Sequence, residues 1–92
     1  MTTQQVVIRN RLGLHARAAA KFVNTATRFR SQIRISRDGR TMDGKSIMGI
    51  LLLAAGAGTT VVITADGADE SAAVDALCQL VNGGFGEDLW NA

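Results

Sequence analysis

The residues best suited to chemistry lie together in the stretch Gly13-Leu14-His15-Ala16-Arg17. His15 is the only histidine in the 92 residues, and a neutral imidazole offers one ring nitrogen as a nucleophile near neutral pH. Arg17 follows two positions later, and its planar guanidinium can hold phosphate oxygens through paired hydrogen bonds. An imidazole beside a permanent cation predicts a histidine that accepts a phosphoryl group.

The place of His15 in the pattern of the chain supports this prediction. A β-branched strand pattern ends before it, and a helical pattern begins at Ala16. The first N–H groups of a helix, here those of Ala16 and Arg17, have no partners within the helix and carry the positive end of its dipole. We therefore expect these two backbone groups to bind phosphate oxygens, while Gly13 lets the loop approach a partner closely.

Other chemistries fit the sequence less well, although a lone histidine can also be a surface residue without a role. We expect no metal, because a zinc site needs several ligands and the chain has one histidine and one cysteine, Cys78. The Gly-x-Ser-x-Gly elbow of hydrolases is absent, and so is a glycine-rich lysine loop for a nucleotide. We expect no cofactor, and any phosphoryl donor must therefore be another protein.

Composition predicts the class of protein. A length of 92 residues indicates one small domain over residues 1–92, and a hydrophobic content of 47% is enough for a single core. A net charge of +2 is mildly basic and well short of a polybasic tail. The longest apolar stretch, residues 47–58, is too short to span a bilayer, and the polar start lacks the layout of a signal peptide. A single cysteine fits a reducing compartment. We therefore expect a cytoplasmic protein without membrane insertion, and we expect it to be a monomer.

The elements that must position His15 follow from apolar periodicity. It predicts strands over residues 6–8, 33–36, 41–43 and 60–64, with Asp38-Gly39 as a two-residue hairpin turn. It predicts helices over residues 16–28, 47–55 and about 70–82, the second ended by Gly56 and the third by Gly83-Gly84. The order β-α-β-β-α-β-α predicts an α+β fold, in which three helices cover one face of a four-stranded antiparallel sheet.

Packing expectations follow from the same patterns. In the first helix one apolar stripe is expected to face the sheet, namely Ala16, Ala19, Ala20, Val23 and Ala26, with Phe22 beside it. In the tail, residues 85–92, the large apolar side chains Phe85, Leu89 and Trp90 are expected to pack back on the domain.

The second helix predicts a docking surface because it is apolar nearly all round. A short surface helix cannot bury every face, so some of Ile47, Met48 and Leu51 should reach solvent and offer a site for a partner. Arg17 and Lys21 on the first helix are either solvated charges or a surface that steers an acidic partner. Nucleic acid is not the expected partner, because aromatic residues do not alternate with the basic ones.

Ser46 has two interpretations. Its position before the second helix is typical of an N-cap, and the spacing favours that role. The alternative is a regulatory phosphorylation site, where phosphate would suit the helix dipole but would place negative charge beside the apolar surface.

Four segments give the sequence a family resemblance. Gly13-Leu14-His15-Ala16-Arg17 resembles the active-site signature of the HPr family, the histidine-containing phosphocarriers of the bacterial phosphoenolpyruvate-dependent phosphotransferase system. Lys45-Ser46-Ile47-Met48-Gly49 resembles its regulatory serine region, Gly58-Thr59-Thr60-Val61-Val62-Ile63 its last strand, and Phe85-Gly86-Glu87 its C-terminal ending. The match keeps order and spacing over nearly the whole chain.

The resemblance implies an open-faced β-sandwich and a protein substrate in a phosphoryl relay, not a turnover enzyme. His15 would accept phosphate on Nδ1 from phosphorylated enzyme I and pass it to IIA domains of sugar permeases or to nitrogen-branch homologues, with Arg17 stabilising the group. In some bacteria an ATP-dependent kinase phosphorylates the family's serine that matches Ser46 and blocks the carrier role, so a serine kinase and phosphorylase are implied partners that depend on the host. The implied docking face comprises Ala20, Lys21, Asn24, Ile47, Met48 and Leu51.

The sequence departs from the family pattern at one position, and two other functional hypotheses are compatible with it. The family often has proline where this chain has Ala18, and losing it loosens the first helical turn without removing a nucleophile or donor. A regulatory module that only docks through Ile47 and Met48 is the second hypothesis. A small basic nucleic-acid binder is the third, and it would show steep salt dependence.

Overall fold

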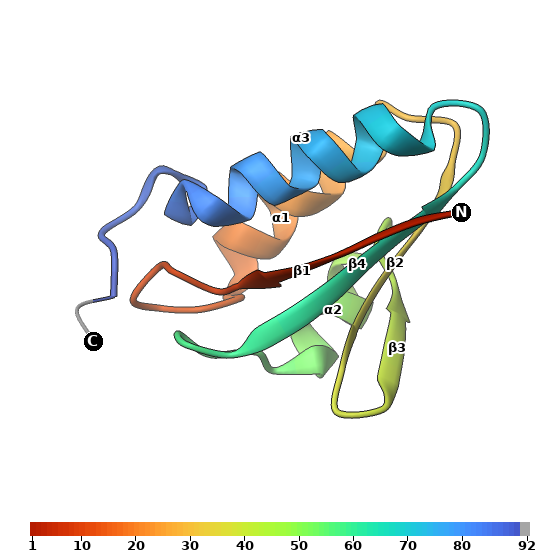
Figure 1. Ribbon diagram of the computed structural model, residues 1–92. Helices are drawn as coiled ribbons and strands as arrows, with labels where there is room; N and C mark the ends of the chain where they lie inside the picture. The colour runs from red at the N-terminus through yellow and green to blue at the C-terminus, as the bar shows by residue number, and fades with distance from the viewer. Residues whose placement is uncertain (91–92) are drawn as a thin grey trace.

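A computed structural model describes residues 1–90 of the chain, and its element order is the predicted one (Figure 1). The elements are β1 (Thr2–Val7), α1 (Ala16–Ala26), β2 (Gln32–Arg37), β3 (Arg40–Asp43), α2 (Ile47–Leu53), β4 (Thr60–Asp66), α3 (Glu70–Asn82) and a short 3₁₀ turn, η1 (Gly84–Gly86). No helix within residues 1–90 has the length and apolar character that a bilayer crossing requires.

The strands form one antiparallel sheet in the order β1-β4-β2-β3. Alternation places Ile63 of β4 opposite Ile35 of β2, and both side chains point into the core. On the other face Arg34 is exposed, so this face is open. Figure 1 shows α1 and α3 side by side across the sheet, and buried side chains of all three helices join one core. The predicted α+β open-faced sandwich is confirmed.

The predicted hairpin turn is confirmed, because Arg37 pairs with Arg40 and leaves Asp38 and Gly39 as the two turn residues. Both have positive φ, +47° and +79°, as a turn that matches the twist of the strands requires. β1 is longer than predicted: its polar residues join the sheet because strand pairing uses backbone groups, which the hydrophobic pattern does not report.

The predicted inward stripe of α1 is partly wrong. Ala16 is exposed and Ala20 is half-buried, whereas Ala18 is fully buried. The helix is rotated so that Phe22, its largest apolar side chain, lies fully within the core. The buried stripe is therefore Ala18, Ala19, Phe22, Val23 and Ala26, and α1 ends at Ala26 instead of residue 28.

The predicted end of α2 is also wrong, because the helix stops at Leu53 and not at Gly56. Ala54 ends it with φ +55°, a left-handed conformation that costs an alanine about 1 kcal/mol. The Arg37 guanidinium donates to the carbonyl oxygens of Leu53 (3.4 Å) and Ala54 (2.8 Å). A side chain from β2 thus satisfies the free carbonyls where a glycine cap was expected.

The start of α3 is tied to the loop after α1. Asp69 accepts hydrogen bonds from the backbone N–H groups of Arg30 (2.8 Å) and Ser31 (3.0 Å) and from the Ser31 hydroxyl. The hydroxyl bond, followed by the Arg30 N–H, lowers the pKa of Asp69 to about 2. This carboxylate connects two loops instead of capping its own helix.

The tail returns to the domain, as predicted. The Phe85 side chain is buried, and Leu89 forms an antiparallel bridge with Asn10. The Trp90 N–H donates to the carbonyl oxygen of Arg9 at 2.6 Å, although Leu89 and Trp90 remain 57% and 45% exposed. Residues 91–92 of the predicted tail lie outside the described residues.

Candidate functional site

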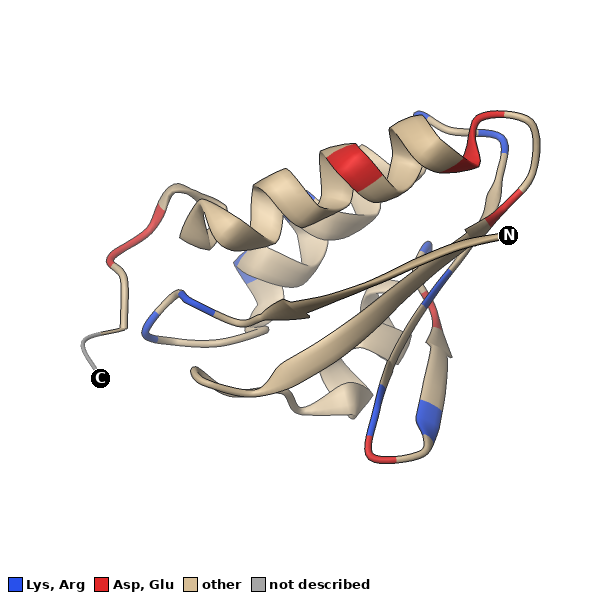
Figure 2. Cartoon of the chain, in the orientation of Figure 1, with Lys and Arg blue, Asp and Glu red and all other residues tan. Residues whose placement is uncertain are grey.

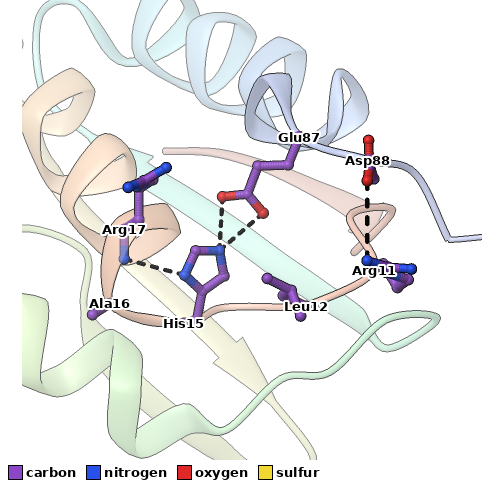
Figure 3. Close-up of a pocket in the computed structure, with 7 residues that line it drawn as sticks. All are labelled: Arg11, Leu12, His15, Ala16, Arg17, Glu87 and Asp88. Atoms are coloured by element: carbon purple, nitrogen blue, oxygen red, sulfur yellow. Dashed lines mark hydrogen bonds and ion pairs between the residues drawn. The ribbon is translucent and has the colours of Figure 1, made fainter.

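His15 is the N-cap of α1, at the place the sequence predicts. Its backbone is extended (φ −79°, ψ 178°), and its ring Nδ1 accepts a hydrogen bond from the Arg17 backbone N–H at 3.3 Å (Figure 3). The side chain is 28% exposed. The imidazole thus occupies the helix start, where one of the first free N–H groups meets Nδ1 directly.

The opposite ring nitrogen faces a carboxylate. Nε2 of His15 lies 2.9 Å and 2.7 Å from the two oxygens of Glu87 (Figure 3). An ionised carboxylate only accepts hydrogen bonds, so Nε2 carries a proton. In the neutral ring Nδ1 is then unprotonated, which agrees with its acceptor role toward Arg17. The hydrogen bond from His15 is the main reason that the pKa of Glu87 lies below its usual range.

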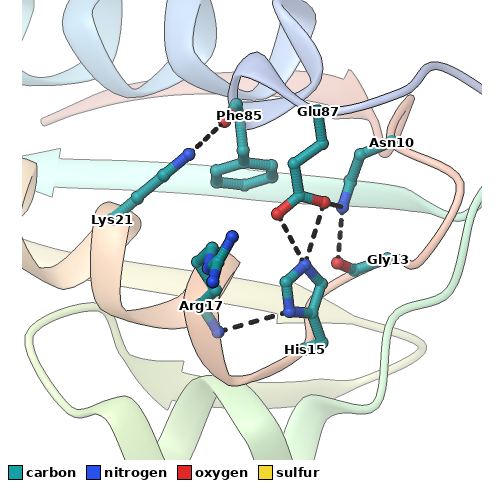
Figure 4. Close-up of polar contacts among 7 residues, drawn as sticks. All are labelled: Asn10, Gly13, His15, Arg17, Lys21, Phe85 and Glu87. Atoms are coloured by element: carbon teal, nitrogen blue, oxygen red, sulfur yellow. Dashed lines mark hydrogen bonds and ion pairs between the residues drawn. The ribbon is translucent and has the colours of Figure 1, made fainter.

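Two side chains, those of Asn10 and Lys21, help to hold the tail where Glu87 reaches the site (Figure 4). The Asn10 amide nitrogen donates to a Glu87 oxygen at 3.1 Å and to the Gly13 carbonyl at 2.7 Å. The Lys21 ammonium donates to the Phe85 carbonyl at 2.6 Å. The loop before α1 and the helix itself therefore both hold the tail beside the imidazole.

Gly13 is required by the backbone of this loop. Its φ is +69°, and an added Cβ would lie 2.7 Å from the Ala55 carbonyl oxygen. The Leu14 N–H donates to that same oxygen at 2.9 Å. Glycine thus lets the loop carrying His15 press against the segment that follows α2.

His15 opens into a cleft of about 490 Å³. Seven residues line it: Arg11, Leu12, His15, Ala16, Arg17, Glu87 and Asp88 (Figure 3). Within residues 1–90 no acidic side chain pairs with the Arg17 guanidinium, whereas Arg11 faces Asp88 at 4.0 Å. Arg17 is therefore available to an anion that enters the cleft.

The predicted docking residues lie on α1 and α2, two helices that pack against each other. Ile47 and Met48 are 43% and 66% exposed, as expected, while Leu51 is half-buried. On α1, Asn24 is exposed and Lys21 is half-buried, its ammonium engaged by the tail.

One further side chain of α2, Leu52, is 57% exposed and was not among the residues predicted to reach solvent. Helical spacing from Met48 to Leu52 was the signal that could have found it. We call Ile47, Met48 and Leu52 the apolar patch.

Ser46 caps α2, as its spacing predicts. Its hydroxyl oxygen accepts a hydrogen bond from the Gly49 N–H at 3.0 Å, and its backbone is extended. The hydroxyl stands at the start of the helix that carries the apolar patch.

Basic residues come from several elements of the chain. Figure 2 shows Lys and Arg in the loop before α1, in α1, in the loop after it and along β2 and β3. Basic residues are thus not confined to one element among residues 1–90, and aromatic residues do not alternate with them in the sequence.

Fold and site together define a class of small open-faced β-sandwich proteins that present one histidine at a helix N-terminus. The model of the family "PTS HPr component phosphorylation site" matches residues 2–83. "Phosphocarrier protein HPr" of Cupriavidus necator is 52% identical over 87 residues, covering 95% of this chain and 98% of the relative. The chain belongs to the HPr family of phosphocarrier proteins of the phosphotransferase system.

Solved structures of the family agree with this fold. "HPr-C-His" of Thermoanaerobacter tengcongensis has a TM-score of 0.93 at 45% identity and covers 97% of this chain and 100% of its own. A structure described as an HPr dimer from the same organism has a TM-score of 0.76 at 45% identity, covering 95% and 100%.

Two residues of the site, Glu87 and Asn10, were not predicted from the sequence. Glu87 had a signal, since it closes one of the segments that resemble the family, but nothing in the sequence pairs it with His15. Asn10 had no signal, because a lone asparagine in a loop is usually solvated.

Proposed function

We propose that this phosphocarrier takes a phosphoryl group from phosphorylated enzyme I on Nδ1 of His15 and delivers it to IIA domains of sugar permeases or to nitrogen-branch homologues. The bond from phosphorus to the donor breaks as the P–Nδ1 bond forms. The proton on Nε2 stays in place, so the ring gains positive charge and the Glu87 carboxylate stabilises it. The carrier is a substrate of both partners and not itself a turnover enzyme.

One observation carries this proposal: the Glu87 contact with Nε2 leaves the lone pair of the ring on Nδ1. Phosphoryl oxygens on Nδ1 would meet the backbone N–H groups of Ala16 and Arg17 at the positive end of α1. The Arg17 guanidinium, which lines the same cleft, would bind them bidentately.

We propose that partners dock on the surface beside His15, through the apolar patch and the neighbouring residues Ala20, Lys21, Asn24 and Leu51. The partly exposed Met48 supports this choice, because a flexible thioether adapts to several different surfaces. A kinase that phosphorylates Ser46, reversed by a phosphorylase, would add negative charge next to this surface and repel an acidic partner. We place the protein in the cytoplasm as a monomer.

The test is phosphoryl transfer with purified components. Incubation with enzyme I and phosphoenolpyruvate should give an acid-labile, base-stable phosphate on the carrier. His15→Ala should abolish labelling while the circular dichroism spectrum and thermal midpoint stay close to wild type, because the ring is a partly exposed cap. Normal labelling of a folded His15→Ala protein would exclude the mechanism. Transfer to a panel of IIA domains from the same cell then identifies the acceptor.

A further inference from the structure

Asn10 is a buried polar residue to which neither the sequence analysis nor the proposed transfer reaction assigns a role. Its side chain is 0% exposed, in the loop between β1 and α1. Its amide nitrogen donates to the Gly13 carbonyl (2.7 Å) and to the Glu87 carboxylate (3.1 Å) (Figure 4). Both partners are acceptors only, so reversing the amide would point its oxygen at a carbonyl and a carboxylate. The donor side of the amide is therefore fixed toward the site.

The other side of the amide contributes little to the fold. No protein group within residues 1–90 donates a hydrogen bond to the buried oxygen Oδ1. A buried acceptor without a partner destabilises the folded state, and an apolar side chain of similar size would avoid this cost. An amide at position 10 is therefore favoured because its nitrogen donates two hydrogen bonds.

The backbone around Asn10 holds the tail at the same place. Asn10 and Leu89 form an antiparallel bridge, and the Arg11 N–H donates to the Asp88 carbonyl at 2.9 Å. An added Cβ on Gly84 would overlap a Leu89 methyl, so the tail is closely packed on itself here. Backbone pairing places residue 87 near the loop, and the Asn10 amide then aims its carboxylate.

These contacts form a connected series that ends at the nucleophile. The Gly13 carbonyl, held by Asn10, also accepts the His15 backbone N–H at 2.9 Å. One amide thus joins the loop that carries the imidazole to the tail that carries its carboxylate partner. We propose that Asn10 is a positioning residue that holds Glu87 on Nε2 of His15, and thereby keeps Nδ1 in the unprotonated form that accepts a phosphoryl group. This inference rests on the proposed function for its role in transfer.

The decisive variant is Asn10→Asp, which keeps the size of the side chain but faces Glu87 with a second carboxylate. Nitrogen-15 NMR of the ring reports directly which nitrogen carries the proton. We expect wild type to hold the proton on Nε2, and Asn10→Asp to show a mixture of the two tautomers with phosphorylation by enzyme I slowed about tenfold. Asn10→Ala should change both readouts in the same direction and serves as the second variant if Asn10→Asp does not fold.

A second substitution that restores the wild-type tautomer would distinguish a positioning role of Asn10 from a general loss of structure. In the double variant Asn10→Asp/Glu87→Gln, the glutamine can donate to Asp at position 10 and still accept from Nε2, so the wild-type tautomer should return in part. The control is Asn82→Asp, the same chemical change on an exposed residue at the end of α3, which should alter neither readout.

Two results would overturn the inference: a folded Asn10→Asp protein with the wild-type tautomer, or a double variant no better than the single one. The NMR readout needs no partner protein. Failure of wild type to be phosphorylated would therefore count against the proposed function alone, whereas an unchanged tautomer would count against the role of Asn10.

Discussion

Removal of the Glu87 carboxylate tests how the His15 site stabilises a phosphoryl group. In the free carrier both Glu87 oxygens lie within 2.9 Å of Nε2. Once Nδ1 carries phosphorus and Nε2 keeps its proton, the ring becomes positively charged and its bond to the carboxylate strengthens. Glu87→Ala should therefore destabilise the phosphorylated carrier more than the free one.

The magnitude follows from the geometry of this pair. A hydrogen bond to a charged group contributes about 1.5–3 kcal/mol. The His15 and Glu87 side chains are 28% and 17% exposed, so screening by solvent favours the lower end of that range. The Glu87 contact also exists in the free carrier, so the transfer equilibrium responds only to the difference between its two strengths. That difference is at most the span of the range, about 1.5 kcal/mol, and screening reduces it to about 0.7 kcal/mol. Because about 1.4 kcal/mol is a factor of ten in an equilibrium constant, Glu87→Ala should shift the transfer equilibrium about threefold toward the donor.

The assay measures the phosphorylated fraction of the carrier at equilibrium with a limiting amount of phosphorylated enzyme I, by phosphorus-31 NMR or native electrophoresis. The control is Asp75→Ala, which removes an exposed carboxylate from α3 and should leave the fraction unchanged. A Glu87→Ala fraction equal to that of the control would refute the claim that the carboxylate stabilises the charged ring.

Three further perturbations follow from the structure. Met48→Glu should weaken partner binding about tenfold or more by placing a charge on the apolar patch, measured by titration calorimetry with enzyme I, while His15→Ala should still bind. Gly13→Ala should lower the free energy of unfolding by more than Gly39→Ala in urea titrations, because both have positive φ but only Gly13 also meets the Ala55 carbonyl oxygen. Asp69, whose pKa is lowered to about 2, contributes stability that is present above its unfolded pKa of about 4 and is lost as pH falls toward 2, so Asp69→Asn should flatten the acid limb of the stability curve.

The fold could be predicted because the alternation in β2 and β4 and the helical periods of α1 and α3 agree with the order of the elements. The predicted helix bounds and buried faces were wrong where contacts with distant residues override the local pattern. The end of α2 depends on Arg37 of β2, which caps the carbonyls of Leu53 and Ala54. The rotation of α1 depends on Phe22 reaching the core, which brings Ala18 inward and leaves Ala16 outside.

The candidate site likewise combines residues placed by local sequence with residues placed by distant segments. The cap positions of His15 and Ser46 could be predicted because the signals for a helix start are local, and both cap contacts are present. Glu87 and Asn10 could not, because their place near the ring depends on a tail that returns across the molecule from a sequence distance of 72 residues for the His15–Glu87 pair. A periodic pattern predicts which face a residue occupies, but it does not predict which distant segment will pair with it.

The alanine at position 18 shows how these local and distant contributions combine at the nucleophile. Proline there would remove an N–H and stiffen the first turn, whereas Ala18 keeps its N–H. The first helical bond to the His15 carbonyl comes from the Ala19 N–H at 2.8 Å, so the three preceding N–H groups have no carbonyl partner in the helix. The segment that forms this turn is therefore more flexible in the unfolded chain. In the folded protein it offers one more backbone N–H donor. Its order in the folded protein depends on the Arg17 N–H to Nδ1 and on the Glu87 contacts with Nε2. The Glu87 contacts hold the imidazole from the tail, so part of the order at His15 comes from a segment far from it in the sequence.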